Sequence, residues 1–270
     1  WDGSHFSEIP SAILDIGKED RSLRCNNFQL LDYDADGEEE IVLSLGSPFR
    51  GFAVVNASPN GLSIIKKVRP DQLLVGSGLL YVAALDYDHD GYDDILTFSP
   101  DGNILKAQPF YNIGGVFDSG HLVKKEIKGL KGILQNSLAL TDWDSDGFSD
   151  ILVSFNSGDI VALTLTPATL VIENIPIATG PLTQIAIADF NQDTYKDILT
   201  LSSEINSLTL VSGKDGGVNN IENAMRKVPS EIQVFSMLPM IKAGVYNGSV
   251  LLSGWDGEIN STYVIQLGNK

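Results

Sequence analysis

The chain has 270 residues, with 35 Asp and Glu against 18 Lys and Arg, and a formal net charge of −17. A chain this acidic repels phosphate backbones, which argues against nucleic-acid binding. Hydrophobic residues make up 43% and charged residues 20%, so a disordered chain is excluded. Since no run of about 18 apolar residues is present, we expect no direct membrane insertion. A single cysteine, Cys25, excludes an internal disulfide.

One acidic phrase occurs four times, with its first aspartate at residues 32, 86, 142 and 189. After each copy, β-branched residues alternate with turn residues, which indicates short strands. In the third repeat the pattern predicts strands at about 136–140, 149–155, 159–165 and 169–175. Four short strands in a repeat of about 50 residues are typical of a β-propeller blade. A parallel β-solenoid or two β-sandwiches are the alternatives.

We therefore predict an all-β fold, a β-propeller of four-stranded antiparallel blades in a single domain spanning residues 1–270. Five blades are favoured over part of a six- to seven-bladed ring. The fifth repeat has lost its acidic phrase, and we expect a turn at Tyr246–Gly248 that binds no ion. Residues 1–20 resemble the last strands of a blade and would complete this repeat. The predicted repeats are 21–75, 76–130, 131–180, 181–235, and 236–270 joined by 1–20.

The acidic phrases place oxygen donors at relative positions 1, 3, 5 and 9 of each loop. Like charges so close together repel one another unless a cation lies between them, and hard oxygen donors on a flexible loop suit Ca²⁺. We expect up to four calcium ions. The predicted ligands are Asp32, Asp34, Asp36 and Glu40; Asp86, Asp88, Asp90 and Asp94; Asp142, Asp144, Asp146 and Asp150; and Asp189, Asn191, Asp193 and Asp197.

Position 6 of the loops is glycine in three copies, Gly37, Gly91 and Gly147, which permits the positive φ needed to wrap the chain around an ion. Thr194 replaces this glycine in the fourth loop, and Asn191 removes one charge there. The fourth site is therefore predicted to be the weakest. An EF-hand is disfavoured, because position 12 is never glutamate and an apolar strand follows position 9 directly.

The Asp-x-Asp-x-Asp-Gly-x-x-Asp loops followed by an apolar strand resemble the FG-GAP and VCBS repeats of integrin α-subunit-like β-propellers. The resemblance covers residues 21 to about 260. The Phe-Gly and Gly-Ala-Pro phrases of the integrin version are absent, so the chain is closer to the VCBS type. This resemblance implies a calcium-binding propeller. Its family includes adhesion receptors, lectins, toxin scaffolds and polysaccharide-active enzymes, so the function stays open.

We expect calcium to have a structural role, because four divalent ions would reduce the net charge from −17 to −9. Exposed loops of this kind bind calcium with dissociation constants of about 10⁻⁴–10⁻³ M. Such weak sites are filled where free calcium is high. We therefore expect an extracellular, cell-surface or periplasmic protein, to which further domains of a longer chain could be attached.

The aromatic residue at position 2 of each loop is interpreted as a packing residue between sheets, in preference to a ligand-stacking platform. A partner would meet the loops at the opposite end of the blades, such as 46–52, 99–103 and 156–159. Phe49, Arg50 and Phe52 are the candidate ligand-binding residues, since two aromatics flanking an arginine are typical of an interaction surface.

The predicted function is a non-catalytic adhesion or recognition module that binds a protein or glycan. One alternative is a polysaccharide-active enzyme of the lyase type, which would need a basic groove and a general base. No paired carboxylates outside the acidic loops suggest such chemistry, so we do not expect an enzyme. An intracellular assembly scaffold is the other alternative, and cytosolic calcium would leave its loops mostly empty.

Overall fold

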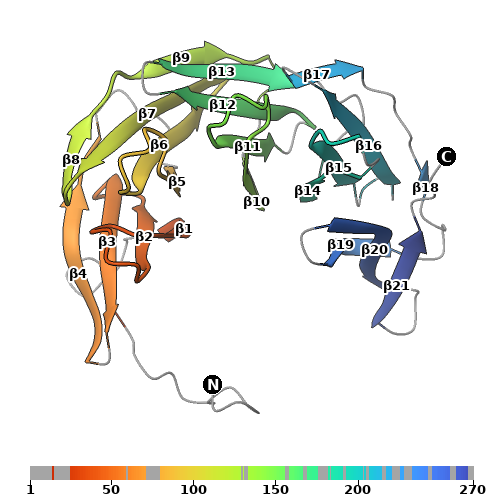
Figure 1. Cartoon of the computed structure of the whole chain (residues 1–270), viewed down its shortest axis with the longest axis horizontal. Helices are drawn as coiled ribbons and strands as arrows, with labels where there is room; N and C mark the ends of the chain where they lie inside the picture. Colours follow the sequence, from red (N-terminus) through yellow and green to blue (C-terminus); the bar gives the residue numbers. More distant parts are fainter. Residues whose placement is uncertain are drawn as a thin grey trace. The chain divides into compact units, whose positions relative to one another are not determined.

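A computed structural model shows that the regular elements of the described residues are all β-strands, β1 to β21 (Figure 1). No helix in this part of the chain has the length and apolar character needed to cross a bilayer. The structure describes residues 14, 25–58, 60–70, 80–128, 130, 133–155, 158–166, 169–175, 182, 184–190, 193–202, 204, 207–214, 217–220, 226–227, 233–242, 245–255 and 260–266.

The chain divides into two compact units, and unit 1, Trp1–Glu126, contains two antiparallel sheets. The first sheet has the sequential order β1 (Cys25–Leu31), β2 (Glu40–Leu45), β3 (Gly51–Ser58) and β4 (Gly61–Val68). The second has β5 (Tyr81–Leu85), β6 (Asp94–Asp101), β7 (Ile104–Ile113), β8 (Val116–Ser119) and β9 (Val123–Glu126). Strands β8 and β9 both pair with β7, so the outer strand of this sheet is interrupted.

Unit 2, Ile127–Lys270, contains three antiparallel sheets. The third sheet has the order β10 (Ile133–Thr141), β11 (Asp150–Phe155), β12 (Ile160–Thr166) and β13 (Thr169–Ile175). The fourth has β14 (Gln184–Ala188), β15 (Asp197–Ser202), β16 (Ser207–Lys214), β17 (Gly217–Asn220) and β18 (Arg226–Lys227), the last two both on β16. The fifth has β19 (Gln233–Lys242), β20 (Val245–Trp255) and β21 (Asn260–Gln266).

The strand pattern predicted for the third repeat is confirmed, since four strands follow one another in the order expected of a blade. The fifth repeat differs from its prediction. Residues 246–248 lie inside β20, where Tyr246 pairs with Ile241, so they form no turn. The hairpin instead closes between Lys242 and Val245. Residues 1–20 lie outside the described residues, and the single domain and its five blades stay predictions.

The second strand lies deep in the core in three of the repeats. In β6, β11 and β15 nearly every residue is buried, as in strands that other elements cover. In unit 1, one apolar cluster joins the first and second sheets through Leu31, Val42, Phe52, Ile95 and Phe110. In unit 2, a second cluster joins the third and fourth sheets; it includes Trp143, Leu152, Ile160, Ile185, Ile198 and Val211.

A polar clamp also joins the first two sheets of unit 1. The Asn27 amide donates to the Val82 carbonyl at 2.7 Å and accepts from the Val82 N–H at 3.0 Å. Ser44 holds Asn27 in place, accepting from its N–H at 2.8 Å. Because β1 and β5 are the first strands of their sheets, this side chain extends the hydrogen-bond ladder from one sheet to the next.

Candidate metal centres

The four acidic loops connect the first and second strands of the first four sheets: β1 to β2, β5 to β6, β10 to β11 and β14 to β15. Each loop follows the first strand of its sheet and ends at the residue that opens the second strand. The strand-to-strand setting predicted from the sequence is therefore confirmed. We number positions within each loop from its first aspartate, so that Asp32, Asp86, Asp142 and Asp189 are position 1.

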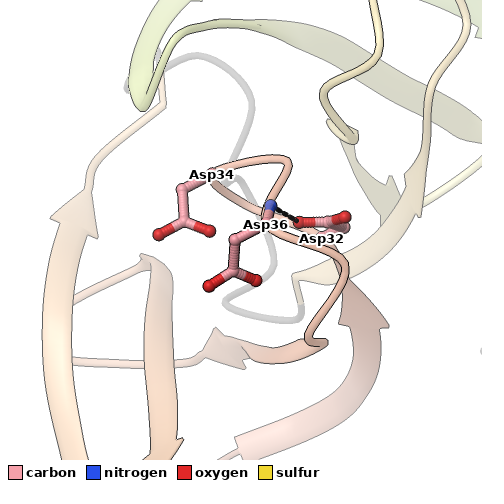
Figure 2. Close-up of side chains that lie close together, drawn as sticks. All are labelled: Asp32, Asp34 and Asp36. Atoms are coloured by element: carbon pink, nitrogen blue, oxygen red, sulfur yellow. Dashed lines mark hydrogen bonds between the residues drawn. The ribbon is translucent and has the colours of Figure 1, made fainter.

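Positions 1, 3 and 5 gather their carboxylates in the first three loops. In each loop one oxygen atom from each of the three residues lies within 4.8 Å of the others. The clusters are Asp32, Asp34 and Asp36; Asp86, Asp88 and Asp90; and Asp142, Asp144 and Asp146. Figure 2 shows the first cluster on the loop after β1. These groups are partly or fully exposed, so a solvated ion can reach them.

Backbone N–H groups hold the carboxylates in this arrangement. In the second loop, Asp86 accepts from the N–H of Asp90 at 3.1 Å and from that of Gly91 at 3.1 Å. Asp90 in turn accepts from the Tyr92 N–H at 2.9 Å. The first loop has the same three bonds, and the fourth has them at Asp189 and Asp193. The local sequence thus folds each loop onto its own aspartates.

Two positions in the loops have a left-handed backbone. Position 6 has φ of +84° at Gly37, +94° at Gly91 and +91° at Gly147, as the glycines predict. Position 4 is also left-handed, with φ near +60° at Ala35, His89 and Ser145. The sequence gives no sign of this second position, because none of these residue types favours positive φ as glycine does.

Position 9 turns its carboxylate inward, away from solvent. Glu40 is 3% exposed, and Asp94, Asp150 and Asp197 are 0% exposed. Each accepts a hydrogen bond from the backbone N–H of position 2 in its own loop, at 2.7–3.3 Å. We call these four carboxylates the loop braces. They tie the start of the loop to its end, a role that the sequence pattern did not reveal; their predicted part as ion ligands stays a prediction.

In two of the braces the second oxygen also accepts a backbone hydrogen bond across the sheet. Asp94 accepts from the Asn112 N–H on β7 at 2.6 Å, and Asp197 accepts from the Gly213 N–H on β16 at 2.9 Å. Burial of these charges changes their acidity. Desolvation raises the pKa of Asp94 to about 7 and that of Asp150 to about 6, with smaller contributions from neighbouring loop aspartates. The pKa of Glu40 is raised by desolvation as well.

These pKa shifts predict a pH dependence of stability in calcium-free protein. An acid whose folded-state pKa exceeds its unfolded value of about 4 binds its proton more tightly when folded. Its contribution to stability is therefore present at low pH and lost as the pH rises. We expect the free energy of unfolding, measured with urea in calcium-free buffer, to fall between pH 5 and about 7. A rise over this range would contradict the shifts, and Asp94→Asn should flatten the profile.

The third cluster has an atom whose environment suits a cation. Oδ2 of Asp142 accepts from the Gly147 N–H at 3.2 Å, whereas its buried Oδ1 has no hydrogen-bond partner. A buried carboxylate oxygen without a donor is costly unless a positive charge compensates it. The donors of all three clusters are carboxylate oxygens, the ligand type that calcium prefers. The residues present therefore fit the ion that the sequence predicted.

The fourth loop keeps its hydrogen bonds but is strained. Thr194 replaces glycine at position 6 and has φ of +81°. A β-branched residue rarely adopts this conformation. Asn191, its predicted position 3 ligand, lies outside the described residues, so the weaker fourth site stays a prediction.

Replacing Thr194 by glycine should relieve this strain. We expect Thr194→Gly to raise the free energy of unfolding by about 1 kcal/mol, because a left-handed non-glycine residue costs about 1–3 kcal/mol and glycine loses part of that gain as entropy. The reverse change, Gly91→Thr, should destabilise the protein by a similar amount. Urea denaturation measures both. Equal stability of all three proteins would show that position 6 is unstrained.

The aromatic residues at position 2 are packing residues, as interpreted from the sequence. Tyr87, Trp143 and Phe190 are buried, and Tyr33 packs against Phe117 with ring centroids 5.6 Å apart. A buried ring cannot stack on a ligand. The sequence feature that predicts this packing role is an aromatic residue repeated at the same position of every loop.

The three candidate ligand-binding residues differ in their burial. Phe52 is fully buried on β3, with its ring 5.2 Å from that of Phe110, so its assignment to a binding surface was wrong. It belongs to β3, whose first five residues are all buried. The glycine and proline nearby in the sequence indicated a loop and hid the start of this strand. Arg50 is exposed, and Phe49 is half-buried under the Arg69 guanidinium, 4.7 Å from its ring centroid.

Residues 82–116 match the FG-GAP repeat model. This segment contains the second acidic loop and the strands on both sides of it. The chain therefore contains an FG-GAP repeat, as the resemblance indicated. No curated protein is significantly similar to the chain in sequence.

The fold is similar to that of several solved β-propeller chains. It matches BBS1N in crystals of its complex with ARL6DN: a lead-soaked crystal at 13% identity and TM-score 0.51, and a mercury-soaked one at 10% and 0.51. The matches cover 89% and 92% of this chain and 67% of BBS1N in each case. A chain of ctPRC2 in complex with H3K27me3 and H3K27M matches at 11% identity and TM-score 0.53. That match covers 89% of this chain and 48% of the other. The likenesses show the fold alone, which is all-β and of the β-propeller type.

Proposed function

We propose that this FG-GAP repeat chain is a non-catalytic propeller module that is stabilised by calcium and binds a protein partner. The observation that carries the calcium assignment is the threefold recurrence of three carboxylates within 4.8 Å. In the second loop, Asp86, Asp88 and Asp90 would hold the ion. A bound calcium ion supplies positive charge there and no chemistry. The backbone bonds described above orient these carboxylates before an ion arrives, which lowers the entropic cost of binding.

The proposed calcium role is structural, since each loop joins two strands of one sheet and carries several negative charges. Four ions would bring the net charge from −17 to −9 and relieve repulsion within the loops. We place the protein in an extracellular, surface or periplasmic compartment, where free calcium is close to the dissociation constants of about 10⁻⁴–10⁻³ M typical of such sites.

Calcium stoichiometry tests this assignment. Asp142→Ala removes position 1 of the third loop and should lower the number of ions bound, measured by calorimetric titration, by one. Asp118→Ala is the matched control, because Asp118 is an exposed carboxylate on β8 outside the loops. A loss of one ion in the control, or no loss in Asp142→Ala, would reject the assignment.

The proposed partner surface lies at the end of the first sheet opposite its calcium loop. The loop after β2 presents Arg50, β4 presents Lys67 near its end, and Arg69 directly follows β4; all three side chains are exposed. Arg69 and Lys67 share the Phe49 ring, at 4.7 and 5.8 Å from its centroid. We define these four residues as the Phe49 cluster. Two cations over an aromatic ring and the exposed Arg50 next to it in the sequence, on a chain of net charge −17, favour a partner with an acidic surface.

Solved structures of similar fold favour a protein partner over a glycan. The similar propeller structures are of BBS1N with ARL6DN and of ctPRC2 with H3K27me3 and H3K27M. ARL6DN, H3K27me3 and H3K27M are partners of those proteins and not of this chain. They support protein binding as one use of this fold, and the partner of this chain is left to experiment.

Quantitative capture from extracellular extract, beside a glycan array, tests the partner assignment. A variant with Phe49→Ser, Arg50→Glu and Arg69→Glu should lose the captured protein. Lys124→Glu with Lys125→Glu is the control, since both lysines are exposed on β9 of the second sheet, whereas the cluster belongs to the first sheet. Binding to the array without protein capture, or equal capture by the two variants, would overturn the proposal.

A further inference from the structure

Two hydrogen bonds join the first and second acidic loops of unit 1 directly. Asp93, at position 8 of the second loop, accepts on its side chain from the N–H of Asp32 at 2.7 Å. The Asp93 N–H donates in turn to the Asp32 carbonyl at 3.2 Å. Asp32 is position 1 of the first loop and Asp93 directly precedes the brace Asp94. The two loops therefore share a two-bond connection between groups that shape each of them.

Asn112 on β7 ties the same two loops together a second time. Its side-chain amide donates to the carbonyl of Tyr33 at 2.8 Å and to that of Asp93 at 3.1 Å. Its own N–H donates to the brace Asp94 at 2.6 Å. Tyr33 donates its hydroxyl to the Gly115 carbonyl on the hairpin after β7, and the Gly115 N–H donates to Asn112 Oδ1 at 2.9 Å, which closes the network. Asn112 is 1% exposed, so this network is shielded from water.

The other described repeats lack these groups. Position 8 is Ser149 in the third loop and Lys196 in the fourth, neither of which carries a carboxylate. In the fourth sheet the residue equivalent to Asn112 is Gly213, since its N–H donates to the brace of that sheet, Asp197. A Cβ atom at Gly213 would lie only 1.9 Å from the Lys196 carbonyl oxygen, so no side chain fits there. The network is thus a feature of the first two repeats.

We propose that Asp93 and Asn112 form a latch that makes the first and second loops one cooperative unit, so that calcium binding to either loop strengthens binding to the other. The cation part of this proposal rests on the proposed function. The new element is the coupling and the two residues that carry it, neither of which is among the expected ligands.

The coupling follows from which groups the latch holds. An ion in the second loop would order residues 86–90, and with them the brace Asp94 and its neighbour Asp93. Asp93 fixes both backbone groups of Asp32, whose carboxylate in turn holds the Asp36 and Gly37 N–H groups of the first loop. The first loop then loses less conformational entropy when its own ion binds. By linkage the effect is equal in the reverse direction.

Asn112→Leu tests the latch without changing any charge. It removes both side-chain donors and the Oδ1 atom that accepts from the Gly115 N–H, and it keeps the Asn112 N–H that satisfies Asp94. The Asn27 clamp between β1 and β5 stays intact, which maintains the packing of the two sheets. Thr97→Val is the matched control, because Thr97 makes a buried hydrogen bond at 3.0 Å to the Gln108 carbonyl inside the second sheet only. Tyr33→Phe removes the hydroxyl that closes the network.

Hydrogen exchange with mass spectrometry reads the two loops separately in the full chain. Calcium is titrated, and the midpoint of protection is followed for peptides covering 30–40 and 84–94. Asp34→Asn with Asp36→Asn disables the first loop. We expect this change to raise the calcium midpoint of the second loop by about 5-fold or more in the wild-type background. In the Asn112→Leu background the shift should be no more than about 2-fold, while Thr97→Val keeps the full shift.

The outcomes separate this proposal from the calcium assignment. If each loop gains protection at the same calcium concentration whether or not the other loop is disabled, the latch is wrong. The calcium assignment would be unaffected by that result. A full shift that persists in Asn112→Leu would assign the coupling to charge alone and also overturn the latch. If calcium protects neither loop, the calcium assignment fails, and the coupled binding fails with it. In calcium-free protein, faster exchange of both loops in Asn112→Leu, and not in Thr97→Val, supports the latch independently of any ion.

Discussion

Removal of calcium should lower the melting temperature of this protein by about 10–20 °C. A site filled at tenfold its dissociation constant adds about 1.4 kcal/mol to the free energy of unfolding. Three or four such sites add about 4–6 kcal/mol together, and in a chain of this size each kcal/mol moves the melting temperature by about 2–4 °C. The measurement is differential scanning calorimetry in calcium-containing and chelator-containing buffer.

Magnesium at the same concentration is the control for ionic strength and charge screening. It prefers strict octahedral geometry and retains its waters, so it should recover only a small part of the loss. Identical melting curves with calcium and with chelator would remove the structural role of the ion. The strands would then be held by their apolar clusters and braces alone.

Asp94→Ala should be among the most destabilising single changes in a loop of this protein, with a loss of about 2–5 kcal/mol. It leaves two buried N–H groups, of Tyr87 and Asn112, without their acceptor, and each such group costs about 1–3 kcal/mol. The brace bonds are present whether or not an ion is bound, so we expect the loss in chelator as well as in calcium. Urea denaturation under the two conditions measures it.

Asp90→Ala is the matched comparison, since Asp90 is exposed and belongs to the carboxylate cluster of the same loop. Removing it relieves repulsion in the ion-free loop and removes a ligand from the filled one. It should therefore lower stability only when calcium is present. If both variants lose stability only in calcium, Asp94 acts purely as a ligand and the brace interpretation is wrong.

The parts of the fold that follow from local pattern could be predicted from the sequence. The spacing of aspartates at positions 1, 3 and 5 alone places their carboxylates together, because the loop folds through hydrogen bonds between residues at most five apart. The glycines at position 6 and the strands on both sides follow in the same way. The aromatic residues at position 2 were identified as packing residues because they repeat beside buried strands.

The parts that depend on distant residues could not be predicted. Asn112 reaches Tyr33 across 79 residues of sequence, and nothing near either residue indicates the contact. Phe52 was misassigned because a Gly/Pro-rich loop continues without a break into a buried strand. The inward turn of Asp94 depends on the N–H of Asn112 on another strand, so its acidity could not be deduced from the acidic phrase that contains it.

The separation of braces from ion-binding carboxylates has a consequence for how the repeats can diverge. The aspartates at positions 1, 3 and 5 could be exchanged in one copy at the cost of that copy's proposed ion, while the buried acid at position 9 would still shape the connection between its strands. The repeats could therefore lose their proposed metal sites one at a time and retain their architecture.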